Sequence, residues 1–125
     1  MKIVIAPDSF KESLSAVSVA ACIEKGFREI FPDADYVTLP LADGGEGTVD
    51  VLLQGLAGQK RTHQVEGPLG GLVSADWAML EPSVHSSKRT ALIEIAAASG
   101  LDLLTPEQRD PLVASSFGTG QLILE

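Results

Sequence analysis

The fold is decided by residues 35–48, whose sequence is DYVTLPLADGGEGT. Its first part, residues 35–41, is apolar and β-branched enough to predict a strand. Glycine occupies three of the four positions 44–47, which permits positive φ angles and lets the backbone approach a ligand closely. A helical pattern then starts at Gly47 or Thr48. The stretch therefore predicts a strand, a tight turn and a helix in succession.

Two carboxylates lie in this turn. Asp43 and Glu46 stand beside the backbone N–H groups of Gly44, Gly45 and the start of the helix. The partial positive charge at a helix N-terminus favours anions. Two roles are therefore open: the carboxylates hold a metal ion or substrate hydroxyls, or the N–H groups cradle phosphate. The alternative is an ordinary helix start with Asp43 or Thr48 as its capping residue. The density of glycine and acid favours a functional turn.

Composition limits the class of protein. The 125 residues are the length of one domain with one core, and the 45% of hydrophobic residues include few aromatics, so the core should be aliphatic. The net charge of −8 argues against nucleic acid or an anionic membrane surface as partner, since both attract clustered Lys and Arg. Cys22 is the single cysteine, so no intrachain disulfide forms, and we expect a buried thiol. No apolar run reaches the roughly 20 residues that span a bilayer, and residues 1–6 are too short for a signal peptide. We expect a cytoplasmic protein.

The chain begins with another strand, loop and helix. Residues 2–6 form a short β-branched run that is typical of a buried parallel strand. The loop at 7–15 follows at the carboxyl end of that strand, where open α/β sheets bind ligands, so Asp8, Ser9 and Lys11 are candidates for contacts with a substrate. The alternative is a simple turn with a solvated Lys11. Apolar residues then recur at helical spacing and predict a helix that faces the core through Ala16, Val19, Ala20, Ile23, Phe27 and Ile30.

Two such segments predict a βαβα arrangement with parallel strands and right-handed crossovers. The second helix carries apolar residues on one face and is expected to end at Gly58, a C-terminal capping glycine. Both loops then emerge at the same edge of the sheet. We therefore expect them to form one composite site.

The middle of the chain changes to alternating polar and apolar residues. Residues 60–79 predict an antiparallel hairpin around a glycine turn at 67–71, continued by a strand at 90–95. His63 and His85 are the only histidines, and neither has a Cys or a second His at metal-ligand spacing. We expect both to be surface residues and not ligands or catalytic bases.

The last part of the chain contains small and hydroxyl-bearing residues. Glu94 is flanked by apolar residues, so it is paired, functional or directed out of a sheet face, and the Ser99-Gly100 pair that follows favours function. A pattern like a capping box starts a helix at Thr105. Residues 115–125 open a further helix that is marginal in length. We therefore expect the 125 residues to be a fragment of a longer protein.

Standard signatures of phosphate binding and hydrolysis are absent from the sequence: G-x-x-x-x-G-K-[ST], G-x-G-x-x-G, H-E-x-x-H and G-x-S-x-G. Any kinase activity must then use a different phosphate site. Four other stretches together resemble the bacterial type-1 glycerate kinase family in their order and spacing: APDSFKESLSA at 6–16, ADGGEGT at 42–48, AAASGL at 96–101 and GTG at 118–120. The resemblance covers essentially all 125 residues.

This resemblance implies transfer of the γ-phosphoryl group of ATP, with a divalent metal such as Mg²⁺, to a hydroxyl of glycerate in the catabolism of glycerate and sugar acids. The usual product in the family is 2-phosphoglycerate, and 3-phosphoglycerate is the alternative. The resemblance also implies a chain several times longer, with one flavodoxin-like and one inserted α/β domain and an active site in the cleft between them. Further glycine-rich segments of the family would lie beyond residue 125. We therefore do not expect the 125-residue chain to catalyse the reaction alone.

Roles for the candidate residues follow from the resemblance, loop position and residue chemistry. Phosphoryl transfer asks a protein mainly to position the reactants and to neutralise charge. Asp8 is the candidate to orient the acceptor hydroxyl as general base, and Lys11 supplies positive charge toward a phosphate or the substrate carboxylate. Asp43 is assigned to catalysis and, with Glu46, binds Mg²⁺ or the glycerate hydroxyls. The remaining substrate contacts are expected from Ser9, Gly44, Gly45, Ser99 and Thr119.

The predicted fold class is α/β, with a parallel Rossmann- or flavodoxin-like sheet, helices on both faces and the start of a second, inserted α/β domain with a β-hairpin. Residues 1–58 would form the first part of the nucleotide and substrate domain, and 59–125 the hairpin and the start of the inserted or continuing region. We expect a monomer or homodimer whose partner is a small-molecule substrate. Two alternatives stay open: a non-catalytic α/β module that binds a small acid, and a structural fragment of the kinase that is inactive.

Overall fold

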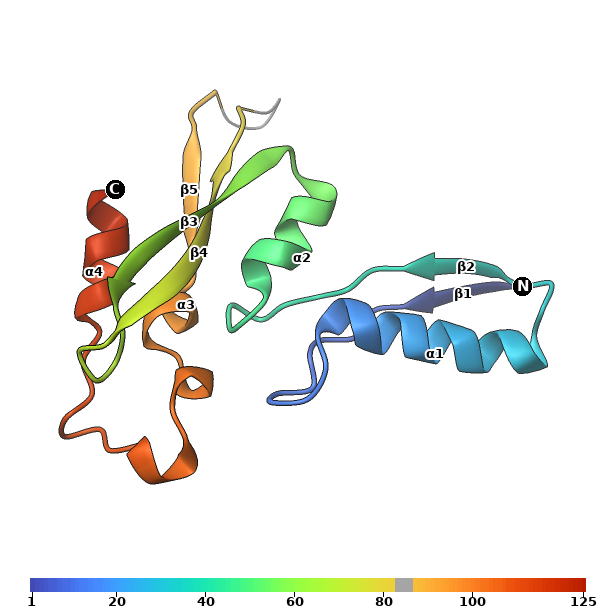
Figure 1. The fold of residues 1–125 in the computed structure, drawn as a ribbon. Helices are drawn as coiled ribbons and strands as arrows, with labels where there is room; N and C mark the ends of the chain where they lie inside the picture. Colours follow the sequence, from blue (N-terminus) through green and yellow to red (C-terminus); the bar gives the residue numbers. More distant parts are fainter. Residues whose placement is uncertain (83–86) are drawn as a thin grey trace. The chain divides into compact units, whose positions relative to one another are not determined.

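The computed structural model describes residues 1–82 and 87–125, and His85 lies outside this part of the chain. Two compact units form, from residues 1–43 and 44–125. The helices and strands follow one another along the chain as drawn in Figure 1: β1 (Lys2–Ile5), α1 (Ala16–Ile30), β2 (Asp35–Thr38), α2 (Thr48–Gly55), β3 (Gly58–Glu66), β4 (Leu72–Leu80), β5 (Thr90–Ile93), α3 (Ile95–Ser99), the 3₁₀ helices η1 (Leu101–Leu103) and η2 (Pro106–Gln108), and α4 (Phe117–Leu124).

The first unit is a parallel pair of strands joined by one helix. β1 and β2 pair in register from Lys2 with Asp35 to Ile5 with Thr38. The helix α1 begins after Ser15, whose hydroxyl accepts a hydrogen bond from the Ser18 backbone N–H at 3.2 Å. The predicted parallel β-α-β segment is confirmed, although both strands are shorter than expected, since β1 ends at Ile5 and β2 at Thr38.

The apolar stripe of α1 is covered only in part, so the prediction that all of it is core is wrong. Phe27 is 44% exposed and Ile30 is 72% exposed, and Cys22 is exposed although we expected a buried thiol. Two strands about 5 Å apart are narrower than a helix about 10 Å wide, which explains the incomplete cover. The buried residues of α1 lie in its first two turns: Ala16, Val19 and Ala20.

The second unit is built on an antiparallel three-stranded sheet in the order β3-β4-β5. β3 pairs with β4 from Gly58 opposite Leu80 to Glu66 opposite Leu72. The connecting turn is closed by a hydrogen bond of 2.6 Å from the Gly67 N–H to the Gly71 carbonyl. The predicted hairpin, its glycine turn and the third strand are confirmed.

Helices cover both faces of this sheet, with α4 on one side and α2 on the other (Figure 1). The face next to α4 holds the main core cluster, made by Val65, Ala75, Trp77, Ala98 and Leu122. The opposite face carries polar side chains of β3 and β4, because successive residues of a strand point to opposite sides. Each unit has buried residues of its own, and the expectation of one core for the whole chain stays a prediction.

The end of α2 differs from the prediction. The helix ends at Gly55, and Leu56 is already extended, with φ −119° and ψ 138°. Gly58 is not a helix cap but the first residue of β3, because it pairs with Leu80 of β4. A Cβ atom at Gly58 would lie 2.9 Å from the Met79 carbonyl oxygen, so the position needs glycine for close packing.

The capping box at Thr105 in the second unit is confirmed, although it starts only the short 3₁₀ helix η2.

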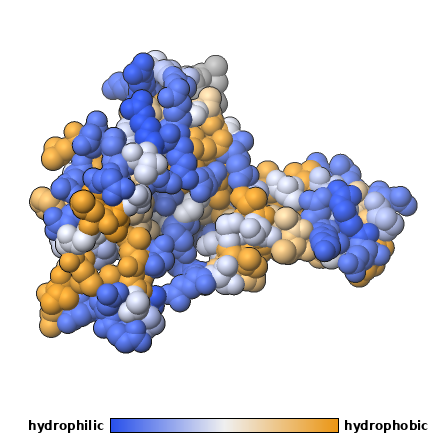
Figure 2. Space-filling model, in the orientation of Figure 1, coloured by the Kyte–Doolittle hydropathy of each residue, from blue (hydrophilic) through white to orange (hydrophobic). Residues whose placement is uncertain are grey.

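Apolar side chains stay at the surface of both units, as the orange areas in Figure 2 show, and the most exposed include Ile30, Leu112 and Leu124. Within residues 1–82 and 87–125, none of the helices combines the length and hydrophobicity needed to cross a bilayer.

Candidate functional site

The N-cap position of α2 carries no capping side chain. Gly47 is the N-cap residue in the left-handed conformation, with φ 84°, and no side chain of the helix start caps it. Thr48 directs its hydroxyl to the Gly45 carbonyl oxygen at 2.8 Å instead of to the helix. The alternative with Asp43 as the capping residue stays a prediction, whereas the alternative in which Thr48 caps this helix is therefore wrong. The reason is that the left-handed turn puts glycine where a capping side chain would stand.

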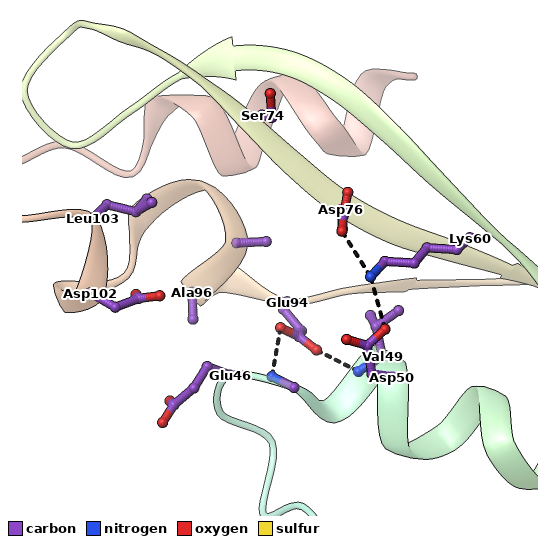
Figure 3. A pocket seen from close by; sticks show the side chains of 12 residues that line it. Glu46, Val49, Asp50, Lys60, Ser74, Asp76, Glu94, Ala96, Asp102 and Leu103 are labelled. Atoms are coloured by element: carbon purple, nitrogen blue, oxygen red, sulfur yellow. Dashed lines mark hydrogen bonds and ion pairs between the residues drawn. The ribbon is translucent and has the colours of Figure 1, made fainter. Parts of the chain in front are cut away.

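A distant carboxylate replaces the local cap. The Gly47 N–H donates to Glu94 Oε2 at 3.2 Å, and the Val49 N–H donates to Glu94 Oε1 (Figure 3). Glu94 itself stands at the N-cap position of α3 but forms no capping hydrogen bond there. Of the three roles open for this acid, the structure shows the paired one. A carboxylate at a helix N-terminus is stabilising because it meets both the unpaired N–H groups and the positive end of the helix dipole.

This contact bears on the two roles proposed for the turn. Two N–H groups at the start of α2 already donate hydrogen bonds to the Glu94 carboxylate, so fewer N–H groups remain for binding a phosphate. Glu46 is partly exposed beside them, and its side chain extends away from Glu94 in Figure 3. The geometry therefore favours the role in which the carboxylate of the turn, and not its N–H groups, meets a ligand.

A pocket of about 260 Å³ lies beside this helix start in the second unit. It is open to solvent, and its walls come from α2, the polar face of the hairpin, α3 and η1 (Figure 3). The lining residues are Glu46, Gly47, Val49, Asp50, Lys60, Ser74, Asp76, Glu94, Ala96, Ala97, Asp102 and Leu103.

One lysine is held among the carboxylates of this pocket. Lys60 Nζ lies 2.8 Å from Asp50 Oδ1 and 2.9 Å from Asp76 Oδ2. Hydrogen bonds to Asp50 and then Asp76 hold the pKa of Lys60 above its ordinary value. The pKa of Asp76 is lowered in turn, first by the Thr62 hydroxyl at 2.7 Å and then by Lys60. These side chains are about half exposed, so the ion pairs add little to stability and mainly fix geometry.

The pocket as a whole is acidic. Its walls carry the carboxylates of Glu46, Asp50, Asp76, Glu94 and Asp102 against the single Lys60, which two of them already neutralise. Such a pocket attracts cations and neutral hydroxyl groups, whereas an anion needs a counter-ion to enter. No cluster of three or more His, Cys, Asp or Glu side chains arranged to hold a metal ion occurs within the described residues.

The candidate residues of the first unit lie on the loop after β1 and at the end of the unit. Asp8 Oδ1 accepts a hydrogen bond from the Ser9 N–H at 2.6 Å. Lys11 is exposed in a tight turn, beside Glu12 with its unusual positive φ of 60°. Asp43 is the last residue of this unit, and Gly44 is the first of the next. The composite site of both loops stays a prediction.

Two candidate hydroxyls of the second unit meet each other. Ser99 Oγ and Thr119 Oγ1 are 2.9 Å apart, and the Thr119 hydroxyl also lies 3.5 Å from the Ile95 carbonyl oxygen. Thr119 is only 9% exposed. The pair therefore joins α3 to α4, and contact of either residue with a substrate stays a prediction.

Comparison with known proteins identifies the family. The model of the glycerate kinase family matches residues 3–125. The chain belongs to the glycerate kinase family. The family resemblance stated from the four sequence stretches is thereby confirmed.

Proteins named as glycerate kinases match this chain with high identity. The chain is 59% identical to the glycerate 2-kinase of Escherichia coli K12 over 125 residues, and 53% identical to the glycerate kinase of Bacillus subtilis 168 over 123 residues. It also matches the crystal structure of a protein proposed to be glycerate kinase 2 from Salmonella typhimurium LT2, with 58% identity and a TM-score of 0.66 over 99% of this chain. The α/β fold class is confirmed. The chain spans about a third of the length of these relatives: 32%, 31% and 32%.

The sequence analysis did not identify several residues that line the pocket. Asp50, Lys60, Asp76 and Asp102 carry no motif, and nothing local distinguishes them from solvated charges. The register of the hairpin was a usable signal for one pair, since Thr62 lies directly opposite Asp76. The contact between Asp50 and Lys60 had no such signal, because it joins a helix to a strand.

Proposed function

We propose that this chain contributes to an enzyme that transfers the γ-phosphoryl group of ATP to a hydroxyl of glycerate, giving 2-phosphoglycerate. The observation that carries the proposal is the match of the glycerate kinase family to residues 3–125, together with relatives more than 50% identical that are named glycerate kinases. The acidic pocket beside the glycine turn supports it, because a polyhydroxy acid offers hydroxyls to carboxylates. ATP as the donor and the position of the new phosphate rest on the resemblance alone.

Mg²⁺ fits the donor chemistry of the turn. The carboxylates of Asp43 and Glu46 are hard oxygen donors, and proteins often bind Mg²⁺ through one or two carboxylates while water and phosphate oxygens complete the shell. When bound, the ion would neutralise charge on the phosphates during transfer. In this proposal Asp43 and Glu46 hold the ion or orient the glycerate hydroxyls, and the acidity of the pocket explains why anionic substrates need such a counter-ion.

Residues of the first loop take the remaining roles in the proposal. Lys11 is exposed and offers a positive charge to a phosphate or to the substrate carboxylate. Asp8 is exposed and would orient the acceptor hydroxyl and take its proton. Ser9, Ser99 and Thr119 would donate hydrogen bonds to the substrate. A monomeric or homodimeric state and a cytoplasmic location stay predictions from the sequence.

A chimera tests these roles in a complete enzyme. This 125-residue segment replaces the matching N-terminal segment of the E. coli glycerate 2-kinase, to which it is 59% identical. Asp43→Asn in the chimera should lower turnover by about 100-fold or more while leaving the melting temperature within about 2 °C, because Asp43 is exposed and its role is chemical.

The matched control is Asp33→Asn, the same chemical change at an exposed residue before β2. Its turnover should stay within about twofold of the parent chimera. An Asp43→Asn variant as active as the Asp33→Asn variant would contradict the role proposed for Asp43.

A further inference from the structure

Glu94 links the glycine turn to the far side of the pocket. Its carboxylate accepts hydrogen bonds from the backbone of Gly47 and Val49, residues that stand 47 and 45 positions earlier in the chain. It is also a lining residue of the pocket, next to Ala96 and across from Lys60 (Figure 3). One side chain thus joins the start of α2 to the junction of β5 and α3.

The turn needs such a tether because of its own composition. Residues 44–47 contain three glycines, two of them with positive φ: Gly44 at 105° and Gly47 at 84°. Glycine has the largest conformational freedom of all residues, so an untethered turn would sample many shapes. Glu46 lies between these glycines, and the direction of its carboxylate depends on their backbone.

The first two residues of the helix start do not supply that tether. Gly47, the N-cap residue, has no side chain, and the Thr48 hydroxyl closes the turn onto Gly45 without meeting the helix N–H groups. Glu94 could instead have capped α3, where it holds the N-cap position, yet it makes no capping bond there. The carboxylate binds the start of α2 instead. This arrangement is expected if the function depends on the shape of the turn more than on a capped α3.

We propose that Glu94 is a positioning residue of the kinase site, which holds residues 44–47, and with them the pocket-lining residue Glu46, in one shape. This inference rests on the proposed function. Glu94 itself need not touch the substrate, since both of its oxygens already accept hydrogen bonds from the protein. Misplacement of reacting groups by about 1 Å lowers rates by about 100-fold, so loss of the tether has a kinetic effect out of proportion to its effect on folding.

The test uses the chimera with Glu94→Ala, Glu94→Gln and Glu94→Asp. Glu94→Ala should lower kcat/KM for glycerate by about 10- to 100-fold at a temperature where the variant is fully folded. Glu94→Gln keeps one acceptor oxygen and should lose less, and Glu94→Asp should lose more than Glu94→Gln because its shorter side chain no longer reaches both N–H groups. The matched control is Glu29→Gln at an exposed position of α1, which should stay within about twofold of the parent.

A second measurement does not depend on activity. Hydrogen exchange of the peptide that covers residues 44–52 should be faster by about 10-fold or more in Glu94→Ala than in the parent chimera, because the Gly47 and Val49 N–H groups lose their acceptor. Normal kinetics in a folded Glu94→Ala variant, or unchanged exchange of this peptide, would overturn the proposal. A parent chimera that shows no glycerate-dependent turnover would refute the proposed function, and the exchange result would still decide whether Glu94 holds the turn.

Discussion

Substitution of Gly118 by alanine should strongly destabilise the second unit, although alanine is the better helix former. Gly118 lies in α4, directly against the backbone of β3. A Cβ atom at this position would be 1.8 Å from the Glu66 carbonyl oxygen and 2.8 Å from its carbonyl carbon. Ordinary contacts of a Cβ start at 3.4 Å. The helix would therefore have to move away from the strand by about 1.6 Å, the difference between 3.4 and 1.8 Å.

The magnitude follows from what that movement disturbs. Leu122 of α4 is 1% exposed and belongs to the core cluster, and Gln121 Oε1 accepts a hydrogen bond of 2.8 Å from the Glu66 N–H. Overpacking costs about 1–3 kcal/mol, and the weakened hydrogen bond adds about 1 kcal/mol. We expect a loss of about 3 kcal/mol, which corresponds to a decrease in melting temperature of roughly 12–24 °C for a unit of this size.

Trp77 makes the assay specific for the second unit. It is the only tryptophan, it is 3% exposed, and it lies in the same core cluster as Leu122. Thermal unfolding followed by its fluorescence therefore reports on the packing of α4 against the sheet.

The neighbouring Gly120 provides the control. A Cβ atom there would meet nothing within 4 Å. Gly120→Ala should thus raise the melting temperature by a few degrees, because alanine is favoured over glycine by about 1 kcal/mol inside a helix. Equal melting temperatures for Gly118→Ala and Gly120→Ala would refute the close packing of α4 on β3.

Other predictions concern the polar groups of the second unit. Because the folded pKa of Asp76 is lowered from 3.8, its interactions stabilise the fold above that pH, and this contribution is lost as the pH falls through the folded pKa. Asp76→Asn should therefore remove about 0.5 kcal/mol or less from the acid dependence of urea unfolding, a small effect because the side chain is 42% exposed. An acid dependence identical to that of the parent would contradict the contacts of Asp76. The raised pKa of Lys60 has the opposite sign: its contribution is present below pH 10.5 and is lost as the pH rises through the folded pKa, so Lys60→Met should remove that alkaline loss in the same unfolding assay. His63→Ala removes the acceptor of the Trp77 Nε1–H, which lies 3.0 Å from His63 Nδ1, and should destabilise by about 1 kcal/mol and shift the tryptophan emission, whereas unchanged emission would speak against this bond.

Local patterns in the sequence were sufficient where neighbouring residues decide the structure. Helix α1 follows from its apolar spacing and from Ser15, and the hairpin follows from alternation around a glycine turn. The parallel pairing of β1 and β2 follows from the length of the crossover helix between them.

Features that depend on distant residues could not be predicted. The cap of α2 comes from Glu94 across more than forty positions, and the end of the same helix is set by the pairing of Gly58 with Leu80. The exposure of Cys22 depends on how many strands cover α1. Gly118 belongs to the GTG stretch at 118–120, yet its close contact with Glu66 is set by the tertiary structure.

The pocket likewise contains residues that the local sequence indicates and residues that only the tertiary structure brings together. The acidic turn at residues 43–47 is visible in the sequence because glycine and acid are concentrated there. Lys60 and Asp76 become part of a pocket only once the hairpin has a register, and Asp50 only once α2 is packed against the hairpin. The sequence therefore indicated the walls made by the glycine turn and by residues 94–97, and left the charged residues of α2 and the hairpin unidentified.

The measurement to make first is release of ADP from Mg-ATP by the purified chimera, with and without D-glycerate, with the phosphorylated product identified by ³¹P NMR. The 125-residue chain of 13.1 kDa is assayed beside it. We predict glycerate-dependent ADP release by the chimera with 2-phosphoglycerate as product, and no release by the isolated chain. A folded chimera that releases no ADP in response to glycerate, while the parent E. coli enzyme does so under the same conditions, would contradict the assignment of glycerate kinase activity to this segment.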